Sequence, residues 1–178
     1  MCFSVEANLV TGAVLLPVGA LALREVRHVR EVPFAVLPLL FAVHQLLEAV
    51  VWAGVDGDVS PRVESAAALA YLLIALPVLP ALFPLAVLLL EPRGARLRVA
   101  PFVALGAVVS AYLTVVVLDG DVGVYAHPHA LVYRTGLEHD AFWTALYIVA
   151  VIGPSLLSGY PSLVAFGLVM VYSSTSAP

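Results

Sequence analysis

The sequence predicts an all-α integral membrane protein, a single domain over residues 1–178 built as a bundle of six transmembrane helices. Three observations support this fold class. Hydrophobic residues make up 62% of the chain and charged residues 11%, against about 45–50% and about 25% in soluble domains. The apolar residues form segments close to the roughly 20 residues that a helix needs to cross the hydrocarbon layer. The charged residues fall mainly between these segments.

The apolar segments are expected to span the membrane in chain order, and the first lacks the basic start and cleavage site of a signal peptide. The third carries Pro77, Pro80 and Pro84. We expect it to be one long kinked helix, because membrane helices tolerate proline and a split would disturb the charge pattern of the loops. The spans are predicted at roughly 6–23, 33–54, 65–90, 98–118, 139–157 and 161–174, the last being short.

The loops between these spans alternate in charge, which predicts their orientation. Arginines occupy the first and third connections, whereas the second and fourth are acidic. By the positive-inside rule the arginine-rich connections are cytoplasmic, so both termini lie outside. We expect a multi-pass protein of the bacterial inner membrane, since the lysine-free, arginine-rich composition is typical of GC-rich bacterial or archaeal genomes. The arginines concerned are Arg24, Arg27, Arg30, Arg93, Arg96 and Arg98.

Composition also excludes several classes of function. The formal charge of −4 and the scattered arginines exclude nucleic acid as a partner, leaving the lipid bilayer and a small-molecule or lipid ligand. Without lysine the chain has no Schiff-base site and no P-loop. Its single cysteine, Cys2, forms no internal disulfide. Haem is disfavoured because only one histidine, His44, is predicted deep in the bundle.

The second span contains the strongest candidate for a functional site. His44 and Glu48 are four residues apart and therefore share one face of a helix, which Gln45 borders and Trp52 continues. An ionisable group at the centre of a membrane helix costs about 2.5–3.5 kcal/mol and usually faces the interior of the protein. This polar stripe therefore predicts a site inside the bundle.

The longest loop, residues 119–138, is expected to cap that site from outside, as an interfacial turn or a helix folded back over the bundle. Cysteine, histidine and carboxylate are the usual ligands of zinc and other transition metals. The predicted topology lets Cys2, Glu48 and His129 converge near the outer leaflet. We expect them to bind a metal, zinc first, with His44 and Tyr133 as supporting or acid–base groups.

Three functions fit this pattern. The first is a metal site, with hydrolysis of a lipid or small molecule as one chemistry it supports. The second is a proton-coupled small-molecule transporter that titrates Glu48, although the cytoplasmic halves of the spans offer little polar lining. The third is a non-catalytic structural or assembly subunit, in which the polar stripe bonds to neighbouring helices and the outer loop binds a partner. Small residues at Gly12, Gly19, Gly106 and Gly167 are expected at close helix contacts.

The opening Met1-Cys2-Phe3-Ser4 and the segment LPLLFAVHQLLEAVVW resemble a family of uncharacterised small bacterial membrane proteins that begin Met-Cys-Phe-Ser. The resemblance covers about the first third of the chain, and residues 129–133 match a further pattern more loosely. That family favours Gln at the position of His44 and Gly at that of Ala49. The resemblance therefore implies roles for Cys2, Glu48 and Trp52, and for Gln45 rather than His44, and it implies no activity.

Overall fold

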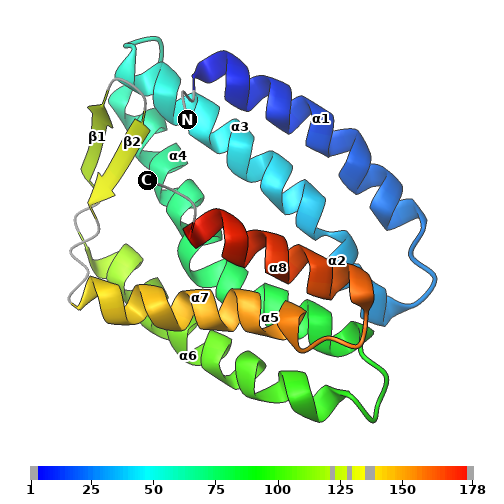
Figure 1. Cartoon of the computed structure of the whole chain (residues 1–178). Coiled ribbons are helices and arrows are strands. Elements are labelled where there is room, and N and C mark those ends of the chain that lie inside the picture. The colour runs from blue at the N-terminus through cyan, green and yellow to red at the C-terminus, as the bar shows by residue number, and fades with distance from the viewer. Residues whose placement is uncertain (1–3, 121–122, 128–129, 135–138, 176–178) are drawn as a thin grey trace.

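The computed structural model describes residues 4–120, 123–127, 130–134 and 139–175, most of them in helices (Figure 1). A β-hairpin interrupts the helical order between α6 and α7. Short helical segments flank or continue the longer helices. The elements are α1 (Val5–Arg24), η1 (Val29–Glu31), α2 (Val32–Ala35), α3 (Leu37–Val55), α4 (Pro61–Leu73), η2 (Ile74–Val78), α5 (Leu79–Leu90), α6 (Arg96–Asp119), β1 (Gly123–His127), β2 (Ala130–Arg134), α7 (Asp140–Leu156) and α8 (Pro161–Thr175).

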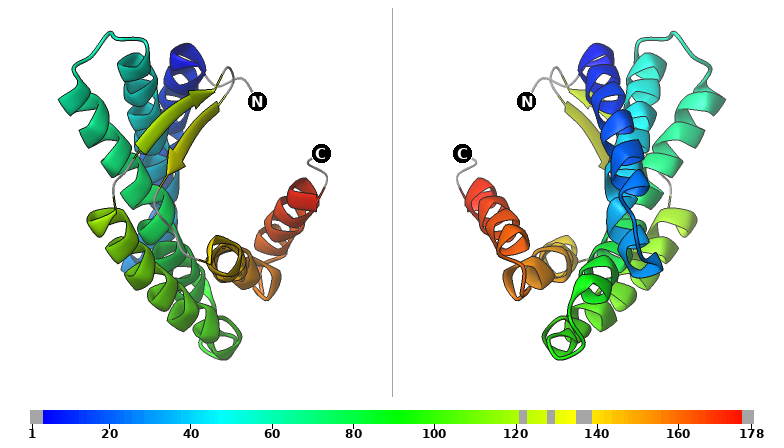
Figure 2. Two further views of the ribbon diagram at one scale, coloured as in Figure 1. Left: turned by 90° about the vertical axis from the view of Figure 1, so that its left-hand side faces the viewer. Right: turned by 90° about the vertical axis from the view of Figure 1, so that its right-hand side faces the viewer.

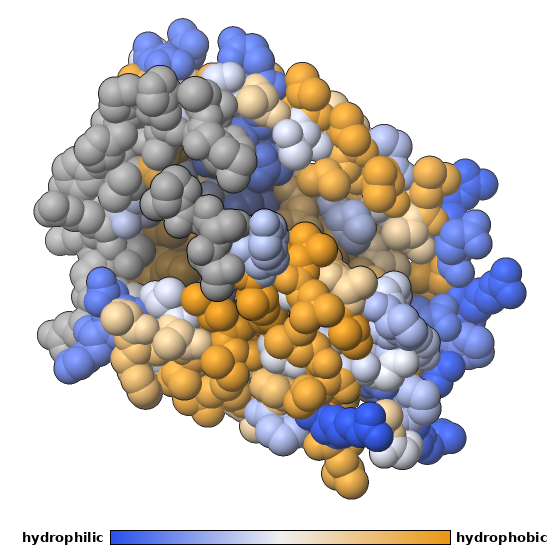
Figure 3. Space-filling view, in the orientation of Figure 1, coloured by the Kyte–Doolittle hydropathy of each residue, from blue (hydrophilic) through white to orange (hydrophobic). Residues whose placement is uncertain are grey.

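The mainly helical fold is confirmed, and apolar helices of membrane-spanning length agree with the predicted membrane protein. Within the described ranges, four continuous helical stretches are long and apolar enough to cross a membrane. α7 and α8 are apolar but shorter, with 17 and 15 residues, so six crossings stay a prediction. Large apolar side chains are exposed along α1 and α6, and an apolar band covers the middle of the face in Figure 3. The four stretches are Val5–Arg24, Val29–Val55, Pro61–Leu90 and Arg96–Asp119.

The third predicted span is one continuous helix, and the prolines disturb its hydrogen bonding as expected. η2 is a π-helical segment around Pro77, in which the N–H of Leu79 bonds to the carbonyl of Ile74. The carbonyl of Ala75 would then need the N–H of residue 80, which is a proline and has none. It accepts a 2.7 Å hydrogen bond from the hydroxyl of Tyr147 on α7 instead. The neighbouring helix thus satisfies the group that the proline leaves free.

Glycines allow the closest helix contacts, as their sequence positions predicted. Gly12 and Gly19 of α1 lie against Leu46 and Leu39 of α3. On α6, a Cβ at Gly106 would stand 1.9 Å from the carbonyl oxygen of Pro80, which is too close for any side chain. The α5–α6 contact therefore depends on the missing side chain of Gly106.

The loop at 119–138 differs from both expected forms, because its described residues make an antiparallel hairpin. β1 and β2 pair from Gly123 opposite Arg134 to His127 opposite Ala130. Val124, Leu131 and Tyr133 pack against Val51 of α3 and Ala67 and Ala68 of α4. Side chains alternate between the two faces of a strand, so one face of the hairpin packs on the helices. A short apolar segment can form such a hairpin without helical periodicity.

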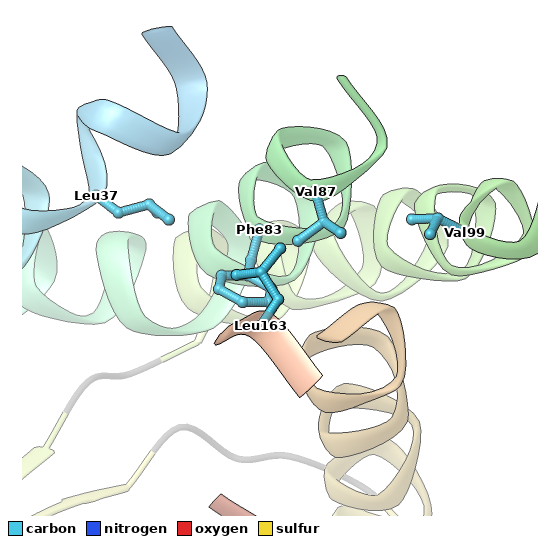
Figure 4. Close-up of a cluster of buried hydrophobic side chains, with 5 residues drawn as sticks. All are labelled: Leu37, Phe83, Val87, Val99 and Leu163. Atoms are coloured by element: carbon cyan, nitrogen blue, oxygen red, sulfur yellow. The ribbon is translucent and has the colours of Figure 1, made fainter. Parts of the chain in front are cut away.

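The connections divide between two ends of the bundle. Residues 25–28 and 91–95, which join arginine-rich segments, lie at one end with the α7–α8 turn (Figure 1). Glu91 is fully buried there and accepts hydrogen bonds from the Ser158 hydroxyl and, at 2.9 Å, from the Gly159 N–H. A core cluster joins α3, α5, α6 and α8 (Figure 4). It is formed by Leu37, Phe83, Val87, Val99 and Leu163.

The opposite end holds the acidic connection 56–60, the start of α1 and the turn end of the hairpin (Figures 1 and 2). This is the end toward which the polar stripe of α3 runs, since Glu48 and Trp52 belong to the second half of that helix. The fold therefore brings the start of α1 and the hairpin to the end where the predicted site lies.

Candidate functional site

The site is built on the face of α3 that turns toward α4 and the hairpin. Helical periodicity places His44, Glu48 and Trp52 on successive turns of one face. Glu48 and Trp52 are each 9% exposed, and His44 is half-buried. A polar face of this kind in an otherwise apolar helix turns inward, because hydrocarbon offers no hydrogen bonds to it.

Three rings join the elements around this face. His44 of α3 stacks on Tyr71 of α4 with ring centroids 4.0 Å apart, and Tyr71 stacks on Tyr133 of β2 at 4.9 Å. The planes are within 23° and 20° of parallel, so the three rings form one continuous stack. The Glu48 carboxyl is near enough to the hydroxyls of Tyr71 and Tyr133 to interact with them electrostatically. The structure thus brings together three predicted site residues, His44, Glu48 and Tyr133.

Several polar atoms at this site have no hydrogen-bond partner. His44 Nε2, Trp52 Nε1 and the Tyr133 hydroxyl are buried and unpaired. Glu48 forms no ion pair with any residue in the described part of the chain. A buried polar group without a partner costs about 1–3 kcal/mol, and a charged one more. Unpaired polar atoms on the residues one turn before and after Glu48, and on Tyr133, are typical of a site that receives a ligand.

The remaining predicted residues are placed less completely. Gln45 is half-buried on α3 beside the stripe, and the structure does not pair it with His44. Cys2 and His129 lie outside the described residues. Within the described ranges, no group of three or more His, Cys, Asp or Glu side chains is arranged to hold a metal ion. Of the three proposed metal ligands, the structure therefore describes Glu48 alone, with His44 one turn away on α3.

The whole chain matches the sequence profile of one protein family, described as a family of unknown function (DUF6629), over residues 1–177. The chain belongs to DUF6629. No curated protein and no solved structure matches it. The resemblance found in the first third of the sequence is thus confirmed as membership of an uncharacterised family, and it extends over the full length of the chain.

Tyr71 is the residue of this DUF6629 site that the sequence analysis missed. It occupies the centre of the ring stack, between His44 and Tyr133. A signal was present, because tyrosine is enriched at membrane interfaces and Tyr71 lies well inside the apolar stretch Pro61–Leu90.

Asn8 of α1, which precedes Gly12 by one turn, is a further buried polar residue, and both of its amide atoms are unpaired.

The chemistry available at the site follows from its groups. Glu48 and His44 can accept or deliver protons, and Glu48 can also bind a cation. The N–H of Trp52 and the hydroxyl of Tyr133 are hydrogen-bond donors suited to an oxygen atom of a ligand. The apolar surroundings strengthen each of these interactions relative to water.

Proposed function

We propose that this protein is a membrane-embedded hydrolase or binding protein whose site, in the outer half of the bundle, is completed by a transition metal. The observation that carries the proposal is the burial of Glu48 between two residues with unpaired polar atoms, His44 and Trp52, and without an ion-pair partner among the described residues. A carboxylate in such surroundings needs a proton, a cation or a metal. The metal is favoured because the segments before α1 and between the two strands contain two further metal-ligating residue types, Cys2 and His129.

Cys2 and His129 are the proposed further ligands, and zinc is the metal that suits Cys, His and Glu best. Cys2 precedes Ser4 by two residues and His129 directly precedes Ala130. Ser4 caps the start of α1, and Ala130 begins β2 at the turn end of the hairpin. Both elements lie at the end of the bundle where α3 ends (Figure 2), and Glu48 belongs to the second half of that helix. Both proposed ligands are therefore close in sequence to elements at that end.

The neighbouring groups give this proposed centre a chemical role. A bound zinc ion polarises a carbonyl oxygen and activates water. In this proposal His44 transfers a proton, and the hydroxyl of Tyr133 and the N–H of Trp52, both unpaired, donate to an oxygen of the substrate. Hydrolysis of an ester or amide in a small molecule or lipid is the reaction that uses these groups together.

The proposal also includes an orientation in the membrane, which follows from the distribution of arginines. With six crossings and the arginine-rich end in the cytoplasm, both termini, the hairpin and the site face outward in the inner membrane. The common placement of the two arginine-rich connections at one end of the bundle supports this arrangement. A substrate would then enter from the outer leaflet or the space beyond it.

Metal analysis of the purified protein tests the proposal. Protein extracted in mild detergent without chelators is expected to carry stoichiometric zinc, measured by mass spectrometry of the elements. Cys2→Ser and Glu48→Gln are expected to lose it, whereas the exposed residues Asp58 and His139 supply matched controls as Asp58→Asn and His139→Ala. Metal-free wild-type protein, or equal metal in Glu48→Gln and Asp58→Asn, would refute the proposed centre.

A further inference from the structure

An apolar groove runs along the inner side of α8. One cavity of about 430 Å³ lies between α2, α3, α5 and the start of α8, and a second of about 210 Å³ continues it between α3, α5, α7 and α8. Phe41, Phe83 and Phe166 line both cavities, so the two adjoin as parts of one groove. We call it the phenylalanine groove. Figure 4 shows Leu163 of α8 against Phe83 of α5 in its wall, with Leu37 nearby.

The groove leads to the candidate site along two elements. On α3, Phe41 is three residues before His44 and seven before Glu48, which places all three on one helix face. On the opposite wall, Tyr147 lines the second cavity and bonds to Ala75, one turn from Tyr71. Both walls of the groove therefore end within one helical turn of the ring stack.

The groove is suited to a lipid chain rather than to a protein segment. Among the described residues that line it, the polar ones are Ser155, Ser162 and Tyr147, whose hydroxyl already bonds to Ala75, and none is charged. It is bounded by the stretches Val29–Val55 and Pro61–Leu90, whose surroundings in a membrane are hydrocarbon. A ten-residue helix about 10 Å across would need about 1,200 Å³, far more than either cavity offers. Small-molecule sites, in contrast, occupy about 300–1,000 Å³.

We propose that the phenylalanine groove holds the acyl chain of a single-chain lipid, whose ester or amide group lies at the Glu48 site. This inference rests on the proposed function, because it names the class of substrate for that site. The apolar chain follows α3 from Glu48 past Phe41 toward Phe34 and Ser162. The carbonyl oxygen of the lipid head group accepts hydrogen bonds from the N–H of Trp52 and the hydroxyl of Tyr133, which lack other partners.

Photo-crosslinking in phosphatidylcholine nanodiscs tests the groove directly. The probe is a hexadecanoyl glycerol with a diazirine at the end of its chain, and labelled peptides are mapped by mass spectrometry. Labels are expected on α2 and the first turns of α8, and excess unlabelled monoacylglycerol should remove them. Labelling that is spread equally over the exposed faces of α1 and α6, or that resists the competitor, would overturn the proposal.

Blocking the far end of the groove supplies the matched variants. Ser162 lines that end, so Ser162→Trp should abolish labelling by the hexadecanoyl probe and retain labelling by an octanoyl probe. Leu168 on the same helix is 58% exposed and lies outside the lining of both cavities, so Leu168→Trp should change neither. Equal labelling of the two variants by the hexadecanoyl probe would contradict the inference.

The outcomes separate the two proposals. Groove labelling in a protein that carries no metal would refute the metal centre and leave the lipid site standing. Stoichiometric metal together with unspecific labelling would do the reverse. Glu48→Gln should lose the metal and keep the label on α8, because the chain is held by apolar residues far from the carboxyl.

Discussion

The hydroxyl of Tyr147 on α7 bonds at 2.7 Å to the carbonyl oxygen of Ala75 in η2, a link across 72 positions of sequence. The acceptor is free because Pro80 cannot supply an N–H and Leu79 already bonds to Ile74. The irregular part of the third membrane stretch is thereby closed by a side chain from a distant helix. A hydrogen bond of this kind fixes α7 against the middle of that stretch.

Removing this hydroxyl should destabilise the bundle. Tyr147→Phe leaves the ring in place and strips the carbonyl of Ala75 of its partner, at a cost of about 1 kcal/mol. The change is measured as a lower midpoint of thermal unfolding in detergent. Tyr112→Phe is the control, since Tyr112 stacks on Trp143 in the same region. If both variants unfold at the wild-type temperature, the bond contributes nothing.

A methyl group at Gly106 should disrupt the α5–α6 contact. Its Cβ would stand 1.9 Å from the carbonyl oxygen of Pro80, so the helices must separate. Overpacking of this kind costs about 1–3 kcal/mol. Gly106→Ala is compared with Gly94→Ala, where a Cβ meets no atom within 4 Å. Unfolding in a denaturing detergent gives the free-energy change, and similar values for the two variants would contradict the close approach.

Replacement of Glu91 should loosen the last two helices. Glu91→Ala removes the acceptor of the Ser158 hydroxyl and the Gly159 N–H, leaving two donors unpaired at about 1–3 kcal/mol each. Glu91→Gln keeps one acceptor oxygen and should be milder. Limited proteolysis at the α7–α8 turn reports the effect, with the exposed Glu25→Ala as the control. Equal protection in all three variants would exclude a role for the carboxylate in holding this turn.

Cysteine labelling in whole cells tests the orientation. In a Cys2→Ser background, a cysteine replacing Asp58 should react with a membrane-impermeant maleimide added outside. A cysteine replacing Gly94 should react only after the cells are opened, because it lies with the arginine-rich connections. The reverse pattern would invert the protein in the membrane and place the candidate site on the cytoplasmic side.

The sequence predicted the helices well because membrane spans are defined by length and apolarity, both of which are local properties. The ends of α1 and α6 lie within two residues of the expected boundaries, at Val5–Arg24 and Arg96–Asp119. The hairpin was not predicted, since two strands of five residues each carry too weak a pattern beside an expected helix or turn. Its place over Ala67 and Ala68 is a matter of packing between distant segments.

Part of the site could also be predicted from local properties of the sequence. Glu48 and His44 could be recognised because polar groups in an apolar helix stand out against their neighbours. The place of Tyr71 in the ring stack and the burial of Glu91 could not be predicted, because each depends on a partner far away in the chain: Tyr133 for the first, and the α7–α8 turn for the second. The roles of Cys2 and His129 remain predictions that the metal analysis addresses.

The carboxylate of Glu91 also bears on the order in which the molecule is made. Ser158 and Gly159 leave the ribosome 67 and 68 residues after it. Throughout that interval the nascent chain carries an acidic group at the end of α5 whose final donors have not yet been synthesised. Only the C-terminal helical pair supplies these donors. A truncated translation product would therefore retain an exposed acidic group without its hydrogen-bond donors, which distinguishes it from the finished protein.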